Sequence, residues 1–79
     1  MKIPVIRQLA QDHSLAVLKE AEENLMNEQA LPIEVQGEDE GEQLTHILGA
    51  IAVREEMEKG ADLVSAVRAY TQRVRDSIK

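Results

Sequence analysis

The sequence predicts an all-α fold: a small bundle of three to four helices that ends in a helical hairpin and is completed by oligomerisation. Three observations predict it. Apolar residues recur at helical spacing along most of the chain, and the few Gly and Pro residues stand mainly between these segments. The 79-residue chain also has no Cys and a single aromatic residue, Tyr70. A chain this short forms one domain, residues 1–79, and small scaffolds without disulfides often gain stability by association.

The N-terminal segment, residues 3–29, forms either two helices or one bent helix. Pro4 suits a first helical turn and precedes a short apolar stripe (Val5, Ile6, Leu9 and Ala10). Ser14 is a good N-cap for a second helix that runs to about Gln29. His13 and Ser14 can equally lie within one continuous helix, so the sequence leaves both arrangements open.

Residues 30–41 are predicted to form a linker. Pro32 prevents the preceding helix from continuing. Ile33 and Val35 alternate with polar residues, which allows an extended piece of three or four residues, too short to make a sheet alone. Gly37 and Gly41 bracket an acidic run, where negative charge favours the N-terminus of the helix that follows.

Residues 42–60 are predicted to form the central helix, on which the other elements pack. One helical face carries Leu44, Ile47, Leu48, Ile51 and Met57. Gly49 lies in mid-helix, where a small residue lets a neighbouring backbone approach closely. Gly60 tolerates the left-handed conformation that ends many helices.

A last helix is predicted from residue 63 to about residue 77, with Asp62 as its cap. It carries a narrow apolar stripe of Leu63, Val67, Tyr70, Val74 and Ile78. The connection after Gly60 is short, so the last two helices are expected to form a tight hairpin. Either this helix, the central helix or both are expected to contact other copies of the chain.

The composition excludes several classes of function. The net charge of −6 disfavours nucleic acid and anionic membranes as partners. The absence of Cys excludes thiol catalysis and Cys-based metal sites. No segment resembles a signal peptide or a membrane span, so a cytoplasmic location is expected.

The charge is also unevenly placed along the chain. Residues 20–42 contain acids and no Lys or Arg, whereas the last helix carries Arg68, Arg73, Arg75 and Lys79. Solvated charged faces are the simpler interpretation, and charge complementarity between subunits is the alternative.

Three residues are candidates for a site: Glu42, His46 and Tyr70. Glu42 and His46 are one helical turn apart, but one such pair falls short of a metal site. The favoured interpretation makes His46 a structural contact that is hydrogen-bonded to Glu42, and Tyr70 a packing residue whose hydroxyl reaches a partner. No catalytic, cofactor-binding or metal-ligating residue is predicted. The alternative is a small ligand or metal bound near these three side chains.

The chain resembles an uncharacterised family of short acidic bacterial proteins, a domain of unknown function found mostly in Bacteroidetes. The resemblance covers MKIPVIR at residues 1–7 and, without gaps, residues 41–79. The second part carries Gly41-Glu42, Leu44, Gly49-Ala50, Val53, Met57, Gly60, Ala66, Ala69, Tyr70, Arg73, Val74 and Ser77-Ile78. Between residues 8 and 40 the chain departs from the family by being shorter and less aromatic.

This resemblance implies a small cytoplasmic helical protein encoded near thioredoxin and peroxiredoxin genes, and it assigns no catalytic residue. The expected function is therefore that of a non-enzymatic protein-interaction or structural protein. The protein is expected to associate with itself and to have another cytoplasmic protein as a further partner. In that role it is expected to be an accessory of a thioredoxin or peroxiredoxin system.

Overall fold

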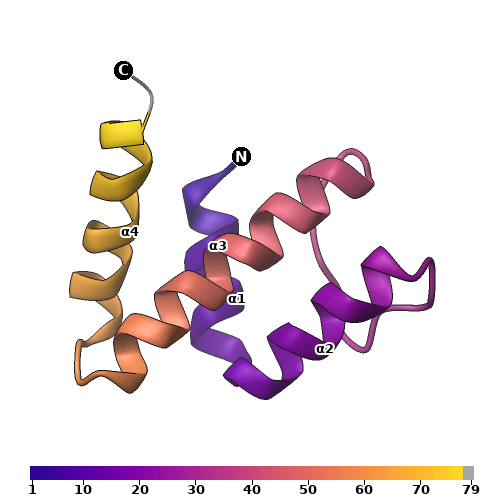
Figure 1. Cartoon of the computed structure of the whole chain (residues 1–79), viewed down its shortest axis with the longest axis horizontal. Coiled ribbons are helices and arrows are strands. Elements are labelled where there is room, and N and C mark those ends of the chain that lie inside the picture. The colour runs from indigo at the N-terminus through magenta and orange to yellow at the C-terminus, as the bar shows by residue number, and fades with distance from the viewer. Residues whose placement is uncertain (78–79) are drawn as a thin grey trace.

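Four helices form the described part of the chain, as predicted for the fold class. The computed structural model describes residues 1–77 and contains α1 (Ile3–Asp12), α2 (Leu15–Met26), α3 (Glu40–Glu58) and α4 (Leu63–Ser77). Figure 1 shows α3 crossing the middle of the bundle, with α1 behind it and α2 and α4 on either side. The helix α3 packs against each of the other three, which confirms that it is the central element.

The N-terminal segment is two helices rather than one. The backbone of His13 is extended, which ends α1, and the Ser14 hydroxyl accepts a hydrogen bond from the Val17 N–H at 3.3 Å to begin α2. The Arg54 side chain on α3 donates to the carbonyl of Ala10 at 2.7 Å. A cation therefore satisfies a carbonyl of the last turn of α1, where the helix dipole is negative.

The helix α2 is shorter than predicted. It ends at Met26 instead of Gln29, because Glu28 adopts a left-handed backbone with φ of 57°. The Asn24 side chain then donates to the carbonyl of Ala30 at 3.0 Å and holds the turn.

The linker between α2 and α3 forms no strand within residues 1–77, but its predicted alternation is real. Val35 is buried and Ile33 is half-buried, whereas Glu34 and Gln36 are exposed. The linker thus lies over the bundle with one side facing the core. It ends earlier than expected, because Gly41 belongs to the first turn of α3.

The helix α3 begins two residues before the predicted start. The carboxylate of Asp39 accepts a hydrogen bond from the N–H of Glu42 at 2.8 Å, so Asp39 is the N-cap and Glu40 the first helical residue. The helix stops at Glu58, two residues before the predicted end, and Gly60 has the predicted positive φ, at 109°.

The last connection is the predicted tight hairpin. The Asp62 carboxylate accepts from the Ser65 N–H at 2.8 Å and caps α4. The predicted stripe on this helix faces α3 and α1 through Leu63, Val67 and Tyr70, all half-buried. Ile78, the last member of the predicted stripe, lies outside the described residues.

The core is aliphatic, as the composition requires. It consists of Val5, Ile6, Leu9, Ala10, Leu18, Ala21, Val35, Ile47, Ala50, Ile51, Val53 and Ala66. One prediction for α3 is wrong: Leu48, which was assigned to the packed face of the helix, is 45% exposed, because the other three helices pack on the remaining sides. No helix within residues 1–77 is long and apolar enough to cross a membrane.

Candidate functional site

His46 is fully buried and connects three distant parts of the chain. Its Nε2 accepts a hydrogen bond from the N–H of Lys2 at 3.0 Å, and its Nδ1 lies 2.7 Å from the carbonyl of Gln36. An amide can only donate and a carbonyl can only accept, so the proton must be on Nδ1 of a neutral ring. The predicted bond to Glu42 is wrong, because both ring nitrogens are taken by backbone groups.

Glu42 lies in the first turn of α3 and contacts both the linker and the start of the chain. Its Oε1 accepts from the N–H of Glu38 at 2.8 Å, and its Oε2 lies 3.6 Å from the amino group of Met1. The hydrogen bond from Glu38 is the main cause that holds the pKa of Glu42 below its ordinary value, and the positive charges of Met1 and Lys2 act in the same direction. The carboxylate therefore ties the linker and the chain start to one helical turn.

The lowered pKa of Glu42 predicts a pH dependence of stability. A carboxyl group with a lower pKa in the folded state stabilises the fold above its unfolded pKa, and this contribution disappears as the pH falls through the folded pKa. The free energy of unfolding should therefore decrease as the pH falls below 4.5, which is the ordinary pKa of a glutamate side chain. Urea titrations at several pH values from about 7 to about 3 check this, with Glu42→Gln as the comparison. Equal slopes in both proteins would assign the acid sensitivity to other carboxyl groups.

Tyr70 closes the same region from α4. Its hydroxyl lies 3.4 Å from the Met1 sulfur, and burial raises the pKa of the phenol. The hydroxyl is also close to Gly49, since a Cβ built on that glycine would be 2.9 Å from it. The absence of a side chain at Gly49 therefore allows α4 and α1 to approach α3 together.

The structure brings all three predicted residues to one place, which we call the N-terminal clasp (Glu42, His46 and Tyr70 around residues 1–2). Each of them holds Met1 or Lys2 through a contact described above. Their polar atoms are engaged with the chain itself. No group of three or more His, Cys, Asp or Glu residues suited to a metal ion occurs among residues 1–77. The arrangement is that of a structural lock between α1, α3, α4 and the linker.

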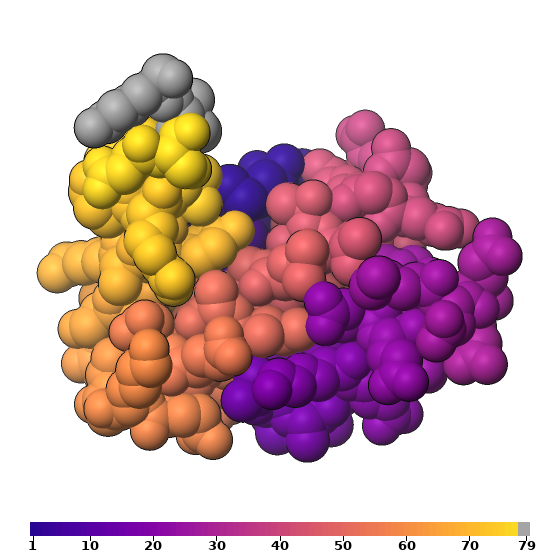
Figure 2. Space-filling model, viewed as in Figure 1, coloured from indigo at the N-terminus to yellow at the C-terminus, as the bar shows by residue number. Residues whose placement is uncertain are grey.

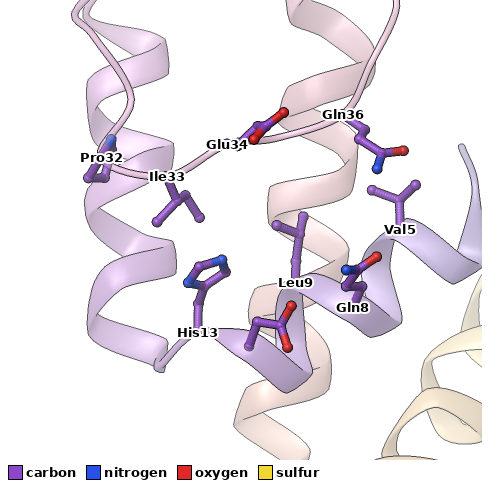
Figure 3. A pocket seen from close by; sticks show the side chains of 9 residues that line it. Val5, Gln8, Leu9, His13, Pro32, Ile33, Glu34 and Gln36 are labelled. Carbon is purple, nitrogen blue, oxygen red and sulfur yellow. The ribbon is translucent and has the colours of Figure 1, made fainter.

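A pocket of about 490 Å³ lies elsewhere, between α1 and the linker. Figure 3 shows Leu9 of α1 and His13, the residue that follows α1, pointing toward the linker that carries Ile33. Gln8 and Gln36 lie nearby. Val5 and Leu9 form buried parts of the wall, and Glu34 and Asp12 add two carboxylates. Sequence reasoning missed this pocket. Its signal was the alternation of the linker, which faces one side toward α1.

A second apolar area is left between α3 and α4. A shallow pocket there is lined by Ala52, Tyr70, Arg73, Val74 and Ser77. Figure 2 shows α3 exposed as a band between α4 and α2 on this face of the molecule. Among large apolar side chains, Leu48 and Val64 are 45% and 49% exposed. Both helices therefore carry accessible apolar side chains.

These features define a small all-α bundle with a structural lock around its N-terminus. The chain belongs to the Family of unknown function (DUF6952), which it matches over residues 1–79. The match includes residues 8–40, where the resemblance seen in the sequence was weakest. No curated protein and no solved structure matches the chain.

Proposed function

We propose that the protein is a non-enzymatic interaction protein that associates with itself. The observation that carries this proposal is the exposed apolar surface of α3, where Leu48 is 45% exposed. Ala52, one helical turn further along α3, is half-buried and borders a shallow pocket shared with α4. Apolar surface of this kind is stabilised when a partner covers it.

The resemblance noted in the sequence suggests the class of any second partner. It favours an accessory role beside a thioredoxin or peroxiredoxin in the cytoplasm. A chain without Cys has no thiol to exchange, so such a role would depend on docking alone. Pull-down with the native cytoplasmic fraction tests it: enrichment of a thiol oxidoreductase supports the role, and its absence removes it.

A second candidate function is the binding of a small ligand. The clasp gives it little support, because binding of a metal to His46 would break one of two hydrogen bonds to backbone groups. The pocket beside His13 favours it more, with its mixed apolar and polar wall. Thermal melts with and without divalent metals test the metal version, because a bound ion must raise the melting temperature by mass action.

Self-association makes a direct prediction. At tens of micromolar the protein should scatter light with the mass of a dimer or a higher oligomer, because association would cover the exposed Leu48. Multi-angle light scattering after gel filtration measures this mass without assumptions about shape. A monomer mass at this concentration would contradict the proposed function.

A further inference from the structure

The exposed side of α3 carries a regular strip of residues. Its members are spaced alternately four and three residues apart: Gly41, Thr45, Leu48, Ala52, Glu55 and Lys59. All are exposed except Ala52, which is half-buried. We call this set the α3 strip. This four-and-three spacing places the six residues along one side of α3. Leu48 and Ala52 are the apolar members, and Ala52 also borders the shallow pocket that α3 shares with α4.

We propose that a second copy of the chain docks on the α3 strip, with the two α3 helices antiparallel about a two-fold axis between Leu48 and Ala52. This inference rests on the proposed self-association and names its interface. In this register Leu48 of each copy meets Ala52 of the other, so a large side chain packs against a small one twice. A two-fold interface must be self-complementary in this way.

The charges at the two ends of the strip favour the antiparallel direction. Lys59 is largely exposed, with 74% of its side chain accessible, and its contact with Glu56 is long at 3.8 Å. An antiparallel partner brings the acidic residues at the start of its α3 helix, Glu38-Asp39-Glu40, toward this lysine. In a parallel pair, Lys59 of one copy would instead lie beside Lys59 of the other, and the two acidic segments would also lie beside each other. Like charges in contact are unfavourable.

The shape of the molecule also suits this docking. The Cα atoms extend over 32 × 29 × 17 Å, so the bundle is a flat slab. Figure 2 shows α3 between α4 and α2 on one broad face of this slab.

Cysteine pairs test the direction and register, because the chain has no Cys of its own. In the proposed register Thr45 of one copy faces Glu55 of the other. We expect Thr45→Cys mixed with Glu55→Cys to give a mixed disulfide well above the statistical share. Each variant alone should give little disulfide, and mass spectrometry separates the products. Arg68→Cys on exposed α4, mixed with Thr45→Cys, is the control. Efficient self-pairing of either strip variant, or no excess of the mixed product, would overturn the proposal.

Two matched substitutions locate the interface without cross-linking. Leu48 and Val64 are almost equally exposed but lie on α3 and α4. Leu48→Asp should raise the dimer dissociation constant by at least about tenfold, since it buries a charge at the centre of the contact. Val64→Asp should leave it unchanged, and circular dichroism checks that both variants fold. Dissociation by Val64→Asp alone overturns the α3 interface but leaves self-association intact, whereas a monomeric parent protein overturns both.

Discussion

Gly49→Leu should destabilise the protein by about 3 kcal/mol or more. A Cβ at this position would lie 2.6 Å from Cδ1 and 3.1 Å from Cγ1 of Ile6, in addition to its contact with the Tyr70 hydroxyl. Ile6 is fully buried, so it has no solvent to move into. The extra side chain must therefore push α1 or α4 away from α3. For a domain of this size, each kcal/mol lowers the melting temperature by about 4–8 °C.

Two further variants calibrate this result. Gly49→Ala adds only the Cβ, and the better helix propensity of Ala returns up to about 1 kcal/mol, so its loss should be distinctly smaller. Glu58→Leu adds the same large side chain at an exposed position of α3 and should leave stability nearly unchanged. Urea unfolding measures all three. A Gly49→Leu protein as stable as the parent would mean that α1 and α4 do not meet at this glycine.

The local features of the fold were predictable because their causes are local. Ser14, Asp62 and Gly60 each act on backbone groups within a few residues, so the chain carries their signals in short stretches. The start of α3 was misplaced for a related reason. Both Asp39 and Glu40 precede the first apolar residue of the helix, and neighbouring acids offer several possible caps.

The tertiary contacts of the site were less predictable. Periodicity placed Leu48 on the apolar face of α3, but that side of the helix is left open once three neighbours have packed on the remainder. Glu42 and His46 were candidates because they lie one helical turn apart, and Tyr70 because it is the single aromatic residue. Their actual partners could not be read from the sequence. Lys2 and Gln36 contact His46 through backbone atoms, which every residue type offers at every position.

The first test of the His46 contacts is the tautomer of its imidazole ring. The two backbone partners require the proton on Nδ1, which the nitrogen chemical shifts of the ring report directly. We expect the Nδ1–H form near neutral pH. A ring protonated on Nε2 instead would contradict both hydrogen bonds, since the Lys2 N–H could not donate to it.

His46→Leu should be among the most destabilising single changes in the chain. Leucine fills much of the same space but leaves the Gln36 carbonyl and the Lys2 N–H without a partner, at about 1–3 kcal/mol for each group that stays dry. Asparagine can replace the donor near Nδ1 and glutamine the acceptor near Nε2, so His46→Asn and His46→Gln should each lose about 1 kcal/mol.

The stabilities of these His46 variants distinguish a structural role of His46 from a ligand-binding one. His13→Leu is the matched control, because that ring lies half-exposed at the pocket and should tolerate leucine within about 0.5 kcal/mol. If His46 is a lock, stability should fall in the order parent, then the two amide variants, then His46→Leu, and protection of the Lys2 amide from hydrogen exchange should disappear with the acceptor. Equal stability of His46→Leu and the parent would contradict the lock. A stoichiometric metal in the parent that is lost in His46→Gln would establish the ligand-binding alternative, because the metal could reach the ring only by replacing one of its backbone partners.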